Sequence, residues 1–168
     1  MSWKELTDCV KEDRERWDKQ SALKLYLVNR EFKLIFRYRL CNEFASKGYL
    51  YPIYLFERFL YHRTSLKCGC DIPSHVKLGK GIQLLHSWGI VINSAVVIGE
   101  HCTILSGAII GKNHTGVPKI GNNVYIGAHA ILLGNITIGD NATIGAGAIV
   151  THDVPSNCVV KGQAATIR

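Results

Sequence analysis

His86 interrupts a regular pattern in the second half of the chain. Aliphatic residues recur every six positions over residues 92–110 and again over residues 120–150. The step from Leu84 to Ile92 is eight, and the additional residues surround His86. Inserted loops frequently carry function, and an imidazole with an unperturbed pKa of about 6.5 exchanges protons near neutral pH. His86 is therefore a candidate for proton-transfer chemistry; the alternative is an exposed corner histidine that only fills the loop.

A second interruption lies between Ile110 and Ile120, where the step is ten. The segment KNHTGVP, residues 112–118, must bulge from the pattern here, and it contains His114. His114 is a second candidate, as a rival base or as a group that binds a substrate, and a solvated loop histidine is the alternative. The remaining histidines have no partners at a meaningful spacing and are assigned no role.

The six-residue pattern predicts the scaffold that positions these histidines. With each aliphatic residue as position one, position two is repeatedly Gly, positions three and four are polar, and position five is small or aliphatic. Such a unit fits one short strand and one corner, where Gly and Asn tolerate a left-handed backbone. Three units close a triangular coil, and stacked coils bury positions one and five. Thirteen units from Ile72 to Val154 therefore predict a mainly β fold, a parallel β-helix of a little over four coils.

Residues three units apart stack on one edge of this prism. On the edge of His86, position three is occupied by Ser106, Ala128 and Ala146. Histidine therefore heads a column of small side chains, and a groove with such a floor admits a slender ligand that runs along the helix axis. The phosphopantetheine arm of coenzyme A has that shape. The loop that holds His114 follows a different corner, so the two interruptions lie on different edges of one chain.

The N-terminal part of the chain has a helical pattern instead. Ser2 leads a sequence with the spacing of a capping box. Apolar side chains recur at helical spacing over residues 21–46, and a further helix is expected to begin at Pro52. The helical pattern stops before the repeats begin. We therefore predict an α-helical region over residues 1–67 and a β-helix domain over residues 68–168.

The net charge of +7 is unevenly distributed. Residues 20–67 hold nine Lys or Arg and three Asp or Glu, interleaved with aromatic residues. Such a surface suits nucleic acid, anionic lipid or a phosphorylated ligand. The alternative, which we favour, is a pair of amphipathic helices whose apolar faces pack on the rest of the protein. We assign no nucleic-acid partner, and a peripheral contact with an anionic membrane stays open.

Length and cysteine content narrow the class further. A chain of 168 residues is long enough for a domain with a core. Its six cysteines show no paired spacing, and neither a signal peptide nor a long apolar span is found, which indicates a reduced, cytoplasmic protein. Cys68 and Cys70 have no second Cys or His pair at ligand spacing. We therefore expect ordinary thiols there and no metal.

The repeats resemble the hexapeptide-repeat acyltransferase family, whose fold is a left-handed parallel β-helix. Residues 71–165 are similar to its serine acetyltransferase branch and to related polysaccharide O-acetyltransferases. The segment CDIPSHVKLGKGIQLLHSWGIVI resembles the Asp-Ile-His-Pro and Asp-His-x-x-Gly-Ile-Val-Val segments of that branch. The segment PKIGNNVYIGAHAILLGNITIGDNATIGAGAIV follows its Pro-Lys-Ile to Ile-Gly-Ala-Gly run. The resemblance covers somewhat over half of the chain, and the helical N-terminus is shorter than in the serine enzymes.

The resemblance implies an O-acetyltransferase that uses acetyl-CoA and no metal. The family histidine that matches His86 is a general base for the acceptor hydroxyl, and Asp71 matches the acidic residue that orients it. A plain corner cap is the alternative for Asp71. The family forms homotrimers with sites shared between subunits, so the loop with His114 could reach the His86 edge of a neighbour. The residues expected to bind the cofactor are Ser106, Gly127, Ala128, Gly145, Ala146 and Lys161.

The sequence departs from the serine enzymes where those bind the amino acid. Their Asp before the catalytic His is Leu85 here, and their Arg-His before Pro-Lys-Ile is Gly116-Val117. Without those charges a zwitterionic acceptor lacks partners when it is desolvated. Trp88 instead offers a ring face of the kind on which sugars stack. We therefore expect the acceptor to be a hydroxyl of a sugar or of a surface-polysaccharide precursor, with serine O-acetylation as the alternative.

Two other function classes share parts of this pattern. A zinc carbonic anhydrase has the same fold but needs three converging histidines, and the chain lacks the closely spaced His pair that would supply two of them. A non-catalytic scaffold or membrane-docking module explains the basic N-terminus but leaves His86 unexplained. Both are therefore ranked below an acetyltransferase.

Overall fold

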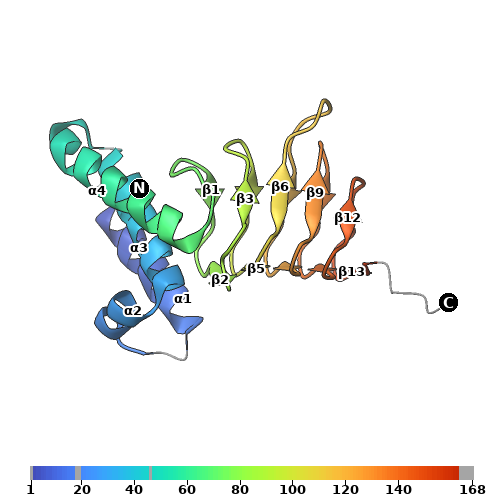
Figure 1. The fold of residues 1–168 in the computed structure, drawn as a ribbon, viewed down its shortest axis with the longest axis horizontal. Coiled ribbons are helices and arrows are strands. Elements are labelled where there is room, and N and C mark those ends of the chain that lie inside the picture. Colours follow the sequence, from blue (N-terminus) through green and yellow to red (C-terminus); the bar gives the residue numbers. More distant parts are fainter. Residues whose placement is uncertain (1, 18–19, 46, 163–168) are drawn as a thin grey trace.

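The computed structural model has helices at one end and a prism of short parallel strands at the other (Figure 1). It describes the chain except for residues 1, 18–19, 46 and 163–168. The helices are α1 (Trp3–Glu15), α2 (Ala22–Val28), α3 (Arg30–Ala45), the 3-10 helix η1 (Gly48–Leu50) and α4 (Tyr51–Cys68). The strands are β1 (Lys77–Leu78), β2 (Gln83–Leu85), β3 (Val91–Ile92), β4 (Val97–Ile98), β5 (Thr103–Leu105), β6 (Ile109–Gly111), β7 (Lys119–Ile120), β8 (Tyr125–Ile126), β9 (Ile131–Leu133), β10 (Thr137–Ile138), β11 (Thr143–Ile144), β12 (Ile149–Val150) and β13 (Val159–Val160).

Strands three units apart lie side by side, as the six-residue pattern predicts. The described strands form three parallel sheets with the orders β1-β4-β7-β10, β2-β5-β8-β11-β13 and β3-β6-β9-β12. Position one of the unit is in register along each sheet and is buried in the prism, together with position five. In the second sheet the aligned residues are Leu84, Ile104, Ile126 and Ile144. The predicted fold class, a left-handed parallel β-helix, is confirmed.

The corners of the prism use a left-handed backbone at position four of the unit. At one corner, His101, Asn123 and Asn141 have φ of 58°, 55° and 59°. Most side chains avoid this region, and Asn and His enter it more readily than most. This accounts for the polar pairs that follow position two in the repeat.

The first helices follow the predicted pattern with one correction. Ser2 caps α1 and forms a capping box with Glu5, as expected. The helix expected over residues 21–46 is instead two helices, α2 and α3. Asn29 separates them because it takes an extended conformation, and its side chain accepts a hydrogen bond of 2.7 Å from the amide of Phe32 at the start of α3.

Helix α4 leads the chain into the first coil. It begins at Tyr51, has Pro52 in its first turn and ends at Cys68. Gly69 follows with a φ of 63°, a left-handed C-terminal cap that turns the chain toward Asp71 at the top of the third sheet. None of the helices in the described part of the chain is long and apolar enough to cross a membrane.

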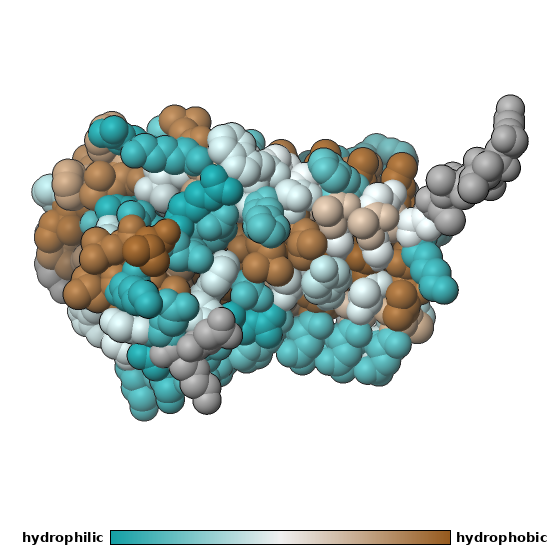
Figure 2. Space-filling model, turned by 60° about the horizontal axis from the view of Figure 1, so that its bottom comes forward, coloured by the Kyte–Doolittle hydropathy of each residue, from teal (hydrophilic) through white to brown (hydrophobic). Residues whose placement is uncertain are grey.

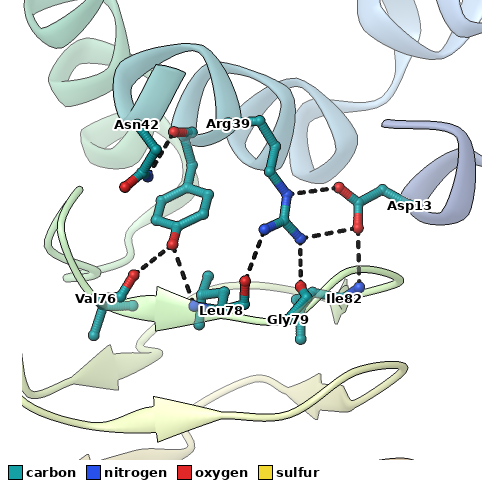
Figure 3. Close-up of polar contacts among 8 residues, drawn as sticks. Asp13, Arg39, Asn42, Val76, Leu78, Gly79 and Ile82 are labelled. Atoms are coloured by element: carbon teal, nitrogen blue, oxygen red, sulfur yellow. Dashed lines mark hydrogen bonds and ion pairs between the residues drawn. The ribbon is translucent and has the colours of Figure 1, made fainter. Parts of the chain in front are cut away.

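Helices α1 and α3 cover the open end of the prism, where β1 would otherwise present an unpaired edge (Figure 3). The guanidinium of Arg39 donates to the carbonyl groups of Leu78, at 2.8 Å, and Gly79. It also binds the carboxylate of Asp13 at 3.0 and 3.2 Å, and Asp13 in turn accepts from the Ile82 amide at 3.1 Å. This buried network joins the helical region to the first coil.

Candidate active site

His86 lies at the corner between β2 and β3, with its side chain exposed and a φ of 51°. It directly follows Leu85, the last residue of β2, which pairs with Leu105 of β5. The ladder resumes where the Gly107 amide donates to the carbonyl of Trp88 at 2.8 Å. This bond is equivalent to the bond from the His129 amide to the Ser106 carbonyl one coil further on, so Trp88 occupies position three above Ser106. His86 lies in the insertion that precedes it.

The column of small residues below this corner is formed as the six-residue arithmetic predicts, but Trp88 occupies its first place, where His86 was predicted. The amide of His129 donates to the carbonyl of Ser106, and the amide of Gly147 donates to the carbonyl of Ala128, each at 2.8 Å. Ser106, Ala128 and Ala146 therefore stand on successive coils of one corner. Ser106 and Ala128 are half-buried and Ala146 is exposed, so small side chains line this edge of the prism.

The backbone at the lower end of this column is tightly packed. A Cβ on Gly127 would lie 2.6 Å from the amide nitrogen of Ala146, and a Cβ on Gly145 would lie 2.9 Å from the carbonyl oxygen of Val160. Lys161 follows β13 and is exposed one residue beyond the pairing of Ile144 with Val160. All six residues expected to bind the cofactor thus lie along or beside one corner.

Ser87 and Trp88, the two residues that follow His86, are fixed to the helical region. The hydroxyl of Ser87, which is fully buried, lies 3.3 Å from Glu31 Oε1 and 3.4 Å from the carbonyl oxygen of Cys68. The thiol of Cys70 donates to the carbonyl of Ser87 at 2.9 Å. Burial raises the pKa of Cys70 to about 11, so it stays a neutral donor. Burial alone would also raise the pKa of Glu31, but the hydrogen bond and charge of Arg30 together with backbone hydrogen bonds outweigh burial and lower that pKa.

The ring of Trp88 packs on the junction between α4 and the first coil. A Cβ on Gly69 would lie 2.2 Å from Trp88 Cε3, so only glycine fits beneath the ring. The guanidinium of Arg30 lies 5.5 Å from the ring centroid, within range of a cation–π contact. The side chain is still 56% exposed, which leaves part of the ring free for an acceptor. The pattern of repeats does not indicate a role for Arg30, Glu31 or Ser87. Gly69 alone could have been predicted, because a glycine after a helical segment is typical of a helix C-terminus.

Asp71 lies on the same coil as His86. Its amide donates to the carbonyl of Ile90 at 2.8 Å, and its carbonyl accepts from the amide of Ile92 at 2.9 Å, so it continues the third sheet beside β3. Within the described chain, no hydrogen bond joins the side chains of Asp71 and His86. Both are exposed, and Asp71 also borders a cavity of about 490 Å³ between α4 and the first coil.

His114 stands apart from this corner. Its loop projects from the prism between β6 and β7, at the corner between the third and first sheets (Figure 1). The loop is closed by a hydrogen bond of 3.0 Å from the amide of Asn113 to the carbonyl of Gly116, and the side chain of His114 is exposed. As expected, the two sequence interruptions lie on different edges of one chain. The described residues also contain no group of three His, Cys, Asp or Glu side chains that could hold a metal ion.

A prism whose coils are each built from three six-residue units is the architecture of the hexapeptide-repeat transferases. The family model described as "Bacterial transferase hexapeptide (six repeats)" matches residues 118–152. The chain is 38% identical over 134 residues to the serine acetyltransferase of Synechococcus elongatus, across 76% of this chain and 54% of the relative. It is 33% identical over 133 residues to the putative colanic acid biosynthesis acetyltransferase WcaB of Escherichia coli, across 76% of this chain and 82% of WcaB.

Solved structures of serine acetyltransferases align with nearly the whole chain. Soybean serine acetyltransferase aligns with a TM-score of 0.80 at 29% identity, covering 97% of this chain and 69% of that one. The serine acetyltransferase of Neisseria gonorrhoeae in complex with serine aligns with a TM-score of 0.79 at 33% identity, covering 98% and 69%. The chain belongs to the hexapeptide-repeat acetyltransferase family that includes the serine acetyltransferases and WcaB. It spans about half the length of the cyanobacterial serine acetyltransferase.

Proposed function

We propose that this protein transfers the acetyl group of acetyl-CoA to a hydroxyl of a sugar or of a surface-polysaccharide precursor. The observation that carries the proposal is His86 in the insertion at the corner where a column of small side chains begins, in a family of acetyltransferases. Acetyl-CoA supplies an activated acyl group as a thioester. His86 takes the proton of the acceptor hydroxyl as its oxygen bonds to the acetyl carbon, and returns that proton to the departing thiolate. Asp71 stabilises the protonated imidazole.

The sugar acceptor is favoured by what the site lacks. The positions that would hold the ammonium and carboxylate groups of serine are Leu85, Gly116 and Val117, and none of them pairs with an ion. Trp88 and His114 would contact the acceptor instead. Serine O-acetylation is the second candidate, because relatives at 38% and 42% identity are serine acetyltransferases.

A thiol-release assay with acetyl-CoA tests the acceptor directly. We expect turnover with members of a panel of sugars and nucleotide sugars and weak or absent turnover with free L-serine. Efficient use of serine, with kcat/KM at or above about 10⁴ M⁻¹s⁻¹, would contradict the sugar assignment and favour the second candidate. Failure to bind acetyl-CoA at all would favour a non-catalytic scaffold.

The proposal includes an assembly and a location. A homotrimer would bring the loop with His114 from one subunit to the His86 edge of the next, which suits their positions on different edges. We also propose that the protein is cytoplasmic and contacts the inner face of the membrane through its helical end. Apolar and hydrophilic surfaces lie side by side at that end (Figure 2). Phe56, Phe59 and Leu66 of α4 are 60%, 54% and 64% exposed there.

A further inference from the structure

A cationic groove runs between α3 and α4. It is a cavity of about 270 Å³. The basic side chains that line it are Arg30, Lys33, Arg37, Arg63 and Lys67. They come from two helices that pack against each other, so the packing of α3 on α4 fixes their proximity. Like charges brought this close repel one another unless counter-charges compensate them.

Only part of this charge is compensated. Arg30 forms an ion pair with Glu31 at 2.8 Å, and Arg37 forms one with Glu57 at 3.0 Å. Among the described residues, no carboxylate lies within ion-pair distance of the other three cations of the groove, Lys33, Arg63 and Lys67. Five cations and two carboxylates leave an excess of three positive charges facing one cavity. A multiply charged anion such as phosphate or diphosphate matches that excess.

The uncompensated side chains are supported by aromatic rings. The ammonium of Lys33 lies 5.2 Å from the ring centroid of Tyr26, and the guanidinium of Arg63 lies 5.8 Å from that of Phe59. Such contacts orient a cation without neutralising it. The half-buried Thr64 lies on the same wall, and its hydroxyl donates to the carbonyl of Leu60 at 2.8 Å, so the cations alone face an anion. The groove is therefore built to receive an anion.

One end of the groove touches the loop that follows His86. Arg30 lines the groove and also lies over the ring of Trp88. Cys68 lines it as well, and its carbonyl oxygen is 3.4 Å from the hydroxyl of Ser87. An anion held by Arg30 therefore lies beside Ser87 and Trp88, the two residues that follow His86. The cofactor column runs from this corner in the other direction, toward the C-terminus.

We propose that the groove between α3 and α4 binds the phosphate groups of the acceptor, which is therefore a sugar linked to phosphate or diphosphate. This inference rests on the proposed acetyl transfer and narrows its substrate class. Arg63 and Arg30 present planar forks that match phosphate oxygens, and Lys33 and Lys67 act as point charges. The sugar extends from the groove past Trp88 to His86. A nucleotide sugar and a lipid-linked sugar diphosphate share this chemistry.

Direct binding tests the groove without turnover. We expect inorganic pyrophosphate to bind the wild-type protein in calorimetry, with affinity about tenfold lower for each removed side chain in Lys33→Ala and in the double variant Arg63→Ala/Lys67→Ala. The matched control is Lys4→Ala/Lys11→Ala, which removes two exposed charges from α1 and should leave the affinity unchanged. Equal pyrophosphate affinity in groove variants and wild type would overturn the proposal. So would a parallel loss of acetyl-CoA affinity, which would assign the groove to the cofactor.

Turnover assays then test whether the groove binds the acceptor, and they distinguish a soluble acceptor from a lipid-linked one. Acetylation of a nucleotide sugar that weakens in the groove variants supports the proposal with a soluble acceptor. Acetylation restricted to a polyprenyl diphosphate sugar in phosphatidylcholine vesicles, with the same sensitivity, supports it with a lipid-linked one. Efficient acetylation of an unphosphorylated sugar that the groove variants do not change would overturn it. Pyrophosphate binding in the groove without acetyl transfer to any acceptor would instead remove the proposed function and leave the anion site standing.

Discussion

At the scale of single residues, the neighbours of His86 hold its backbone in an uncommon conformation. A left-handed φ on a non-glycine residue costs about 1–2 kcal/mol, and His86 has a φ of 51°. The buried hydroxyl of Ser87 and the packed ring of Trp88 fix the next two residues on the helical region. The imidazole therefore has a defined place at the corner where the column begins rather than at the tip of a free loop.

We expect His86→Ala to lower kcat by about 10²–10⁴-fold, the contribution of a positioned general base, and to leave acetyl-CoA affinity largely unchanged. Thiol release measures the first quantity and calorimetry the second. The matched control is His129→Ala, which removes an exposed imidazole from the same corner two coils away. Wild-type turnover in His86→Ala, together with an inactive His114→Ala, would transfer the role of base to the loop.

The small side chains of the column make a second prediction. Ala146 is exposed and lies outside the aliphatic core, so Ala146→Trp should block the pantetheine channel without unfolding the coil. Calorimetry should show a loss of acetyl-CoA affinity, and circular dichroism should show an unchanged fold. Glu100→Trp adds the same ring at position three of the corner between the first and second sheets, which holds neither interruption, and serves as the control. Unchanged affinity in Ala146→Trp would exclude this column as the cofactor site.

At the scale of elements, α1 and α3 cover the open end of the first coil. The edge of β1 exposes carbonyl groups that water would otherwise satisfy, and Arg39 of α3 binds two of them inside the protein. Its charge is in turn matched by Asp13 of α1, and both side chains are nearly fully buried. Removal of one partner leaves a buried charge without compensation.

We therefore expect Arg39→Ala to lower the free energy of unfolding by about 3–5 kcal/mol, measured by chemical denaturation. Arg58→Ala removes an exposed arginine of α4 and should change stability little. The double variant Asp13→Ala/Arg39→Ala should lose less than the sum of the two single variants, because the uncompensated charge is gone. Additive losses in the free energy of unfolding would show that Asp13 and Arg39 stabilise the packing of the helices on the first coil independently.

The β-helix repeats could be predicted from the sequence to a greater extent than the packing of α1 and α3 on the first coil. The column from Ser106 to Ala146 could be predicted because one rule, three units of six residues, fixes which residues stack. The rule misplaced His86, because it cannot say where within an eight-residue step the additional residues lie. Nothing periodic relates Asp13 to Arg39 or Glu31 to Ser87, since each pair meets through the packing of separate elements. The break at Asn29 was missed for a similar reason. Apolar spacing continues across it, while one side-chain cap on the Phe32 amide divides the helix.

At the scale of the whole molecule, one chain does not bring its two interruptions together. His86 stands at the corner between the second and third sheets, and the loop with His114 leaves the corner between the third and first. A threefold arrangement of parallel prisms would place the loop of one subunit beside the His86 edge of the next. Two halves of one site would then belong to different chains.

Mixing two inactive variants tests this shared site. We expect His86→Ala and His114→Ala each to be slow, and we expect a mixture of equal amounts, unfolded and reassembled together, to recover activity. In random trimers each site takes His86 from one subunit and His114 from its neighbour, so about a quarter of the sites regain both histidines. If both histidines served one site within a single chain, every chain would lack one of them and mixing would restore nothing. Recovery toward a quarter of wild-type turnover, with a trimer by light scattering, therefore supports the shared site, and a mixture no faster than its components contradicts it.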